Sequence, residues 1–336
     1  METRLRPMSL GEILDLTAQL YRSNFLLFCG IASVYAGAIL LMELAHIGLQ
    51  QLFLALHWTA QVGALNIGAL LVQWLVMFLI GGLAVAANNR AVSWVHLGQR
   101  ATIRGAYASV LPQLGRVLWL MTIIAFVLWT PLALCYGGFL SATLVWYKPL
   151  LKSGSVQHNP QAAMLFAMLG LAFFVAASAA ILYAALMGLR YALAVPACVV
   201  EKIKARAALK RSIYLSQGSR GRIFVLGLLI VAIQLALVGI TQAFFIVLAF
   251  RSHMTLPVWA RVTQQIVAFL TNSFIGPMYA TGLTLFYYDQ RVRKEGFDIE
   301  WMMQAAGLAT STAPAAEVAQ TSEPPLEDEI LPEARE

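Results

Sequence analysis

Charged residues are scarce in this sequence of 336 residues. They make up 12% of it, whereas hydrophobic residues make up 60%. A soluble domain carries about 25% charged residues. Because so little charge cannot cover a globular surface, the composition excludes a soluble protein. Repeated apolar runs of about 20 residues are instead typical of helices that cross a membrane.

Cysteine and catalytic motifs are also lacking. The only cysteines, Cys29, Cys135 and Cys198, are too few and too far apart for a disulfide framework or a thiolate metal site. The sequence has no Walker A loop, HExxH, GxSxG elbow or strand-linked GxGxxG. We therefore expect no enzyme activity and no cofactor, although an intramembrane enzyme that uses scattered polar residues stays an alternative.

Histidine does not supply a metal site either. Four of the five histidines, His46, His57, His158 and His253, fall on one predicted side of the membrane. Glu43 and His46 share a helix face at a spacing of three, and such side chains can bind zinc. The four histidines lie on three different loops, however, and no ligand spacing relates them. We expect them to lie at the interface without a metal.

The apolar stretches predict an all-α membrane protein, a six-transmembrane helical bundle. Each stretch can cross about 30 Å of hydrocarbon at 1.5 Å per residue. The predicted spans are residues 25–45, 62–87, 117–140, 163–189, 223–249 and 262–288. They divide the chain into an N-terminal segment (1–24), a membrane domain (25–302) and a tail (303–336). The tail is rich in Ala, Thr, Pro and Glu, and we expect it to be disordered and cytoplasmic.

The basic residues predict the orientation. Segments on one side of the six spans hold 19 Lys and Arg, against 4 on the other side. By the positive-inside rule both termini are cytoplasmic, and the expected location is the bacterial cytoplasmic (inner) membrane. Because the basic residues lie between apolar spans, we expect contact with anionic lipid rather than with nucleic acid.

Residues 9–22 predict an amphipathic helix on the inner face of the membrane. Ser9 and Glu12 have the spacing of a capping box. Apolar side chains then recur at helical spacing from Leu10 to Tyr21. This helix would lead directly into the first span.

The middle of the chain indicates a parallel internal repeat. Spans two and three, with their basic loop, resemble spans four and five with theirs. Both loops hold an Ala-rich basic stretch and then a Gly-Arg pair, Gly115–Arg116 and Gly221–Arg222. A generic basic amphipathic linker explains the similarity almost as well.

Small and polar residues inside the spans indicate helix packing. Span four carries a stripe of small residues at a spacing of four, namely Ala172, Ala176, Ala180, Ala184 and Gly188. Such a stripe allows close helix approach, so we expect span four at the bundle centre. Five amides are expected to hydrogen-bond between helices or to line a polar path, namely Asn66, Gln73, Gln234, Gln242 and Asn272. Pro131 and Pro277 lie inside spans three and six and predict kinks.

The fourth loop is the candidate binding segment. Between residues 190 and 222 it carries eight Lys and Arg against one acid, Glu201. An amphipathic helix there would place four cations near anionic headgroups of the inner leaflet: Lys204, Arg206, Lys210 and Arg211. The alternative is that these charges only set topology and are solvated.

The segment after the last span predicts a helix stop. Asp289–Arg293 and Arg291–Glu295 have the i,i+4 spacing of helical ion pairs. Gly296 suits the left-handed cap position, and Asp298 can cap a short helix that anchors at the interface.

Three segments resemble a known bacterial membrane-protein family. They are LRPMSLGEILDLTAQLYRSNFLLF (5–28), PACVVEKIKARAALKRSIYLSQG (196–218) and LFYYDQRVRKEGFDIEWM (285–302). They are similar to the membrane domain of glycerophosphoryl diester phosphodiesterase and to related multi-pass proteins. In phosphodiesterases of that name a separate barrel domain carries the catalysis, and its His-Arg-Gly-type signature is lacking here. The resemblance therefore implies a membrane fold and no hydrolase activity.

Two functional classes remain. The first is a non-catalytic scaffold, assembly or regulatory component with membrane-protein partners. The second is a transporter or lipid-handling protein with a cavity between the helical repeats. The lack of charges at the membrane centre favours the first class. The paired units and the two prolines favour the second.

Overall fold

The computed structural model describes residues 6–147, 160–251 and 256–305. Within these ranges the chain is helical and contains no strand. Six helical runs there are long and apolar enough to cross a membrane, which confirms the predicted all-α architecture. Several of the predictions concern residues outside these ranges: the tail beyond Ala305, Lys148, Lys152, His158 and His253.

The elements follow one another from the N-terminal helix to a short final helix. They are α1 (Leu10–Ser23), α2 (Phe25–Ala55), α3 (Thr59–Val76), the π-helical turn η1 (Met77–Gly81), α4 (Gly82–His96), α5 (Ile103–Val110), the 3₁₀ turn η2 (Leu111–Gln113), α6 (Leu114–Ala142), η3 (Thr143–Tyr147), α8 (Pro160–Tyr191), α9 (Ala194–Glu201), α10 (Ala205–Ser216), α11 (Arg220–Arg251), α12 (Val258–Glu295) and α13 (Phe297–Ala305). Both basic loops therefore contain helices of their own. The helices α6 and α12 continue through Pro131 and Pro277.

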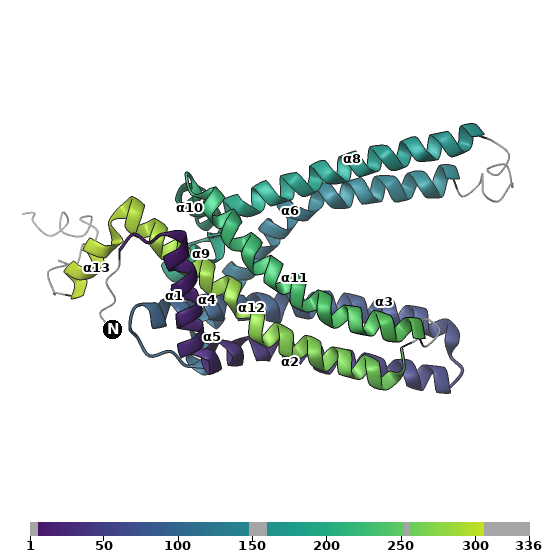
Figure 1. Ribbon diagram of the computed structural model, residues 1–336, viewed down its shortest axis with the longest axis horizontal. Helices are drawn as coiled ribbons and strands as arrows, with labels where there is room; N and C mark the ends of the chain where they lie inside the picture. Colours follow the sequence, from purple (N-terminus) through teal and green to yellow (C-terminus); the bar gives the residue numbers. More distant parts are fainter. Residues whose placement is uncertain (1–5, 148–159, 252–255, 306–336) are drawn as a thin grey trace, which may run out of the picture.

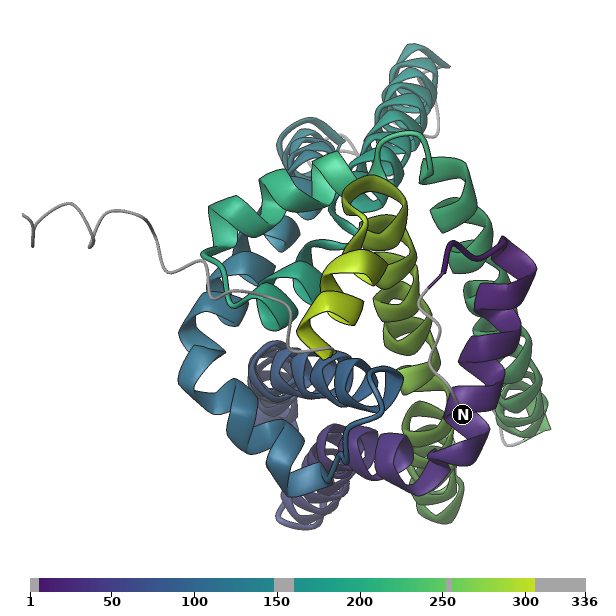
Figure 2. The same cartoon turned by 90° about the vertical axis from the view of Figure 1, so that its left-hand side faces the viewer.

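The short helices gather at one end of the bundle (Figure 1). We call this the basic end, formed by α1, α5, α9, α10, α13 and the last turns of α12. In Figure 2 these helices surround the end of α12. The last turns of α12 are buried from Thr281 to Gln290, and Leu285, Phe286 and Tyr287 are each 0% exposed. The main core of the molecule therefore lies at the basic end.

The capping box predicted for α1 is confirmed. The Glu12 carboxylate accepts from the Ser9 backbone N–H at 2.6 Å, and the Ser9 hydroxyl accepts from the Glu12 N–H at 3.3 Å. The first of these bonds, with help from Arg6, lowers the pKa of Glu12 to about 2. The apolar face of α1 packs on the protein, because Ile13 is fully buried in the main core.

The expectation that span four lies at the bundle centre is wrong. Its most apolar window is only 6% buried, the lowest value of the six spans, against 33% for α12. Figure 1 shows α8 paired with α6, with both diverging from α2, α3, α11 and α12. Of the stripe, Ala180 is 7% exposed, whereas Ala172 and Ala176 are exposed. The neighbour of α8 is α6, where Phe173 stacks on Phe139 with 4.5 Å between ring centroids. A small-residue stripe therefore does not by itself indicate a central position.

The α2 helix continues past its predicted end to Ala55. The predicted span ended at residue 45, beside two ionisable side chains, Glu43 and His46, which are costly inside a membrane. In the structure these two lie 3.8 Å apart, and His46 Nε2 is 3.0 Å from Asn66 Oδ1 on α3. Each polar group has a partner, so the helix continues.

Candidate functional site

A cavity of about 490 Å³ lies among α2, α3, η1, α4, α6 and α12. Its walls are mostly aliphatic and aromatic, and include Tyr35, Phe78 and Met121. None of the described residues that line it is acidic or basic. Ligand sites commonly have volumes of 300–1,000 Å³, an apolar lining and a few placed polar groups. This cavity has those properties.

Two local features of the third and fourth helices shape the wall. The π-helical turn η1 contributes Met77, Phe78 and Gly81, and such turns often occur at functional sites. At Gly82 a Cβ atom would lie 2.8 Å from the Met121 sulfur. Glycine at this position therefore allows α4 and α6 to approach closely beside the cavity.

The lining residues with polar side-chain groups are Asn88 and Asn272, which carry amides, Tyr35, which carries a hydroxyl, and Trp74 and Trp129, which carry indole N–H groups. Asn88 is 3% exposed, and its amide Nδ2 donates to the Pro277 carbonyl at 3.2 Å. The Asn88 Oδ1 atom has no hydrogen-bond partner among the described residues. Leaving such an acceptor buried and unpaired costs about 1–3 kcal/mol. Asn272 was predicted to be an inter-helix or path-lining amide from its place in a span, whereas Asn88, just beyond span two, was not among the predicted amides.

The cavity is closed at one end and open at the other. Ala84 and Ala280 lie near the Asn88–Pro277 contact and are 7% and 8% exposed. Trp74 and Trp129 line the other part and are 57% and 61% exposed. The buried amide of Asn88 therefore lies at the closed end, and the two tryptophans lie at the open rim.

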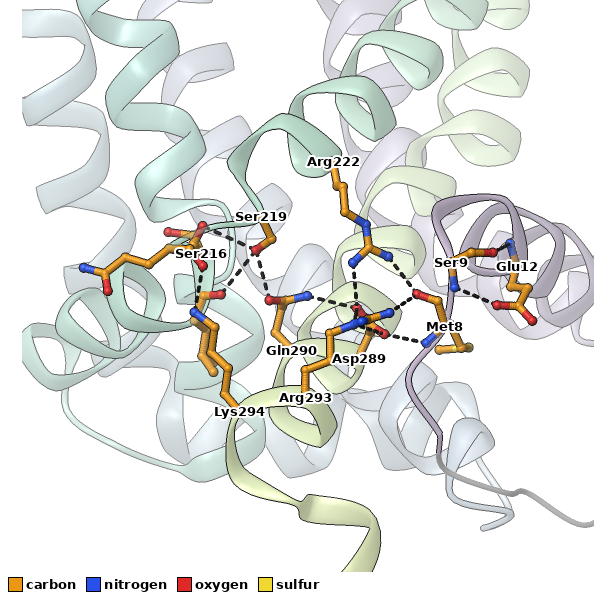
Figure 3. Close-up of polar contacts among 12 residues, drawn as sticks. Met8, Ser9, Glu12, Ser216, Ser219, Arg222, Asp289, Gln290, Arg293 and Lys294 are labelled. Carbon is orange, nitrogen blue, oxygen red and sulfur yellow. Dashed lines mark hydrogen bonds and ion pairs between the residues drawn. The ribbon is translucent and has the colours of Figure 1, made fainter.

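A second candidate site is a charged network around Asp289 (Figure 3). The carboxylate is 0% exposed and accepts from Arg293 Nε at 3.0 Å and from Arg222 Nη1 at 3.5 Å. It also accepts from the backbone N–H of Met8 at 2.7 Å. The same two arginines donate to the Met8 carbonyl, at 2.6 and 2.7 Å. One carboxylate and two guanidinium groups therefore hold both polar groups of a single residue.

The neighbouring residues extend this network along α12. Gln290 donates to Asp289 at 2.9 Å and accepts from the Ser219 hydroxyl at 3.0 Å. Lys294 donates to the carbonyls of Tyr214 and Gln217 at 2.7 and 2.8 Å, at the end of α10. A cation at the carbonyl end of a helix is favourable. The network therefore holds the N-terminal segment, α10 and α11 against α12.

The Glu201 carboxylate forms a third group of contacts at the end of α9. It accepts from Tyr287 at 2.6 Å and from Arg211 Nε at 2.9 and 3.1 Å. Arg211 also pairs with Glu295, at 2.7 Å, and Glu295 pairs with Arg291, which confirms the predicted i,i+4 pair. Although burial alone lowers the pKa of Arg211, its hydrogen bonds with Glu201 and Glu295 raise that pKa overall.

The four residues predicted to meet lipid headgroups thus fall into two groups. Lys204, Arg206 and Lys210 are exposed on α10 or its N-cap. Arg211 is half-buried and carries the two carboxylate contacts just described. Three of the four side chains are thus exposed, while the fourth holds α10 to α9 and α12. Sequence spacing does not separate them because the partner Glu295 lies 84 residues away.

The helix stop after span six is confirmed. Asp289 pairs with Arg293, and Gly296 adopts a left-handed conformation with φ 64° at the end of α12. Asp298, expected as a cap, lies instead in the first turn of α13, which begins at Phe297. Arg291 lies 3.9 Å from the Phe297 ring centroid, and this contact holds the start of α13 against α12.

Polar contacts between α4 and α12 went unrecognised in the sequence. Thr284 donates to Asn89 Oδ1 at 3.0 Å, and the hydroxyls of Ser93 and Tyr288 are 2.6 Å apart. Asn89 and Ser93 lie beyond the predicted end of span two, in a segment interpreted as loop, whereas Thr284 and Tyr288 lie within predicted span six. Their only sequence signal was the concentration of polar residues at 88–93 and 284–290 at helical spacing.

The amides predicted to join helices have mixed outcomes. Gln264 on α12 donates to Gln242 on α11 at 2.8 Å, and Asn66 contacts His46. Asn272 lines the cavity instead. Among the described residues, no three His, Cys, Asp or Glu side chains are grouped closely enough to hold a metal ion.

Comparison of the chain with protein-family models, with curated proteins and with solved structures returns no match.

Proposed function

We propose that this chain is a lipid-handling protein of the bacterial cytoplasmic membrane. The observation that carries the proposal is the apolar cavity of about 490 Å³ within the six-span bundle, open at Trp74 and Trp129. Its lining suits an acyl or other hydrocarbon chain, because burying apolar surface is favourable and no charge has to be desolvated. The basic end would then face the cytoplasm, as the positive-inside rule requires.

The resemblance to the glycerophosphoryl diester phosphodiesterase membrane domain is consistent with this proposal. It implies a membrane fold without its own hydrolytic chemistry. In this proposal the protein binds lipid without reacting with it. Anionic headgroups of the inner leaflet would contact the exposed cations of α10.

The test is photolabelling with a diazirine-bearing hexadecyl probe, mapped by peptide mass spectrometry on the purified full chain. We expect saturable labelling of residues at the cavity, such as Met77 and Met121. Ala125 lines the cavity on α6, so Ala125→Phe should reduce this labelling about tenfold by filling the space. Ala32→Leu on α2 is a second variant that fills the same cavity.

The matched control is Ala133→Phe, on an exposed position of the same helix outside the cavity lining. It adds the same side chain and should leave labelling unchanged. Labelling that does not saturate, or that the three variants affect equally, would contradict a cavity-bound chain.

A scaffold or assembly role is the second candidate, and one observation favours it. The acids Glu201, Asp289 and Glu295 all hold elements of the basic end together, which gives a rigid charged platform. The exposed face of α10 would then be a surface for membrane-protein partners. Crosslinking through a cysteine placed at Arg206 would distinguish this role, because a scaffold yields one discrete adduct.

A further inference from the structure

The closed end of the cavity has a chemical preference that the proposed function does not specify. We propose that the cavity selects an uncharged lipid whose polar end carries a hydroxyl group, with that hydroxyl donating to Asn88. This inference rests on the proposed lipid-handling function and narrows its ligand class.

The cavity lining is unfavourable for a charged lipid headgroup. None of the described residues at the cavity is acidic or basic, so an ionised carboxylate or phosphate would lose its hydration there without a counter-ion. The described ion pairs around Asp289 and Glu201 lie outside the cavity lining, and their charges already have partners in the protein.

The orientation of the Asn88 amide then determines whether its unpaired atom is a hydrogen-bond donor or an acceptor. Its NH₂ group must face the Pro277 carbonyl, because the opposite orientation would place two acceptor oxygens 3.2 Å apart. Thr281 also donates to that carbonyl, at 2.8 Å, so the carbonyl has two side-chain donors. The unpaired group of Asn88 is therefore an acceptor, and a ligand must supply a donor.

The shape of the cavity orients such a ligand. The hydroxyl would lie at Asn88, between α4 and α12 and toward the basic end. The hydrocarbon chain would extend past Met77 to the rim at Trp74 and Trp129, whose side chains are largely exposed. An alcohol fits this arrangement, since it combines one donor with an uncharged tail. An ether lacks the donor, and a fatty acid carries a charge.

The experiment compares three competitors of the hexadecyl photoprobe on the full chain in detergent: oleyl alcohol, oleyl methyl ether and oleate. Oleyl alcohol should protect the cavity at about a tenfold lower concentration than its methyl ether, which has the same chain and no donor. Oleate at neutral pH should protect no better than the ether. Equal protection by the alcohol and the ether would overturn the inference while leaving the proposed function intact.

The variant Asn88→Leu tests whether Asn88 causes the preference for the alcohol over the ether. It should keep saturable photolabelling and lose the preference for the alcohol over the ether. Asn272→Leu, at the exposed amide, is the matched control and should keep that preference. Retention of the preference in Asn88→Leu would also overturn the inference. Should Asn88→Leu fail to fold, the competitor comparison on the parent protein still decides. Absence of saturable labelling in the parent would instead overturn the proposed function.

Discussion

The Asp289 carboxylate accepts a hydrogen bond from the backbone N–H of Met8 at 2.7 Å, across 281 residues of sequence. Arg222 and Arg293 surround the same carboxylate and bind the Met8 carbonyl. The start of the described chain is thereby fixed to its last long helix. A buried carboxylate is stable only when such partners surround it.

Replacing Asp289 by Asn should therefore destabilise the protein strongly. The substitution leaves Arg222 and Arg293 beside an uncharged amide, and removing one partner of a buried ion pair costs about 3–5 kcal/mol. We expect a clear drop in the thermal unfolding midpoint in detergent. Protease cleavage near Met8 should also increase, because the segment loses an anchor.

Asp15→Asn is the matched control. Asp15 is exposed on α1, and the same change there should alter stability by less than about 0.5 kcal/mol. Similar midpoints for the two variants would show that Asp289 does not anchor the N-terminal segment.

The sequence predicted the spans well because hydrophobic length is a local property. The capping box of Ser9 and Glu12 and the Gly296 cap were also readable, since each depends on residues three to five apart. The contacts that assemble the basic end were not readable. Asp289 reaches Met8, and Arg211 reaches Glu295, over distances that no spacing rule covers.

The cavity could not be predicted from the sequence for the same reason. Its wall combines Tyr35, Met121 and Pro277, which belong to three separate spans. Pro277 was noticed as a potential kink, but nothing indicated that its carbonyl would meet Asn88 on α4. The proline had a visible local effect, whereas its partner depends on how the helices pack.

Arg211 and its neighbour Lys210 should behave differently although both are basic residues of α10. Arg211→Gln breaks contacts with Glu201 and Glu295 and should lower stability by about 1–3 kcal/mol. Lys210→Gln changes an exposed side chain and should have little effect. Thermal unfolding of both purified variants checks this, and equal midpoints would contradict a holding role for Arg211.

Two alanines of the α8 stripe provide a similar comparison. Ala180 is 7% exposed, so Ala180→Leu should overfill its contact with the protein and cost about 1–3 kcal/mol. Ala176 is exposed, and Ala176→Leu should be tolerated. Detergent melting of the two variants distinguishes the positions. Destabilisation by Ala176→Leu alone would indicate that this face has a partner in the membrane.

The orientation can be tested with reporter fusions at two positions. A fusion after residue 155 should report outside the cytoplasm, and one after residue 305 should report inside. The physical reason is the excess of basic residues on the segments at one side of the six spans. The reverse pattern would place the basic end outside and remove the inner-leaflet proposal.

Anionic lipid should bind the exposed cations of α10 in a salt-dependent manner. Each basic residue near an anionic surface contributes about 1 kcal/mol, which falls off within a Debye length. Replacing Lys204, Arg206 and Lys210 together by Gln should therefore weaken retention of phosphatidylglycerol and make the remaining affinity less dependent on salt. Arg211 is left in place because its carboxylate contacts hold the fold, so any loss belongs to lipid contact. Five basic residues remain between 190 and 222, and topology should survive. If the triple variant retains the lipid as well as the parent across a salt titration, these cations only set the topology during insertion.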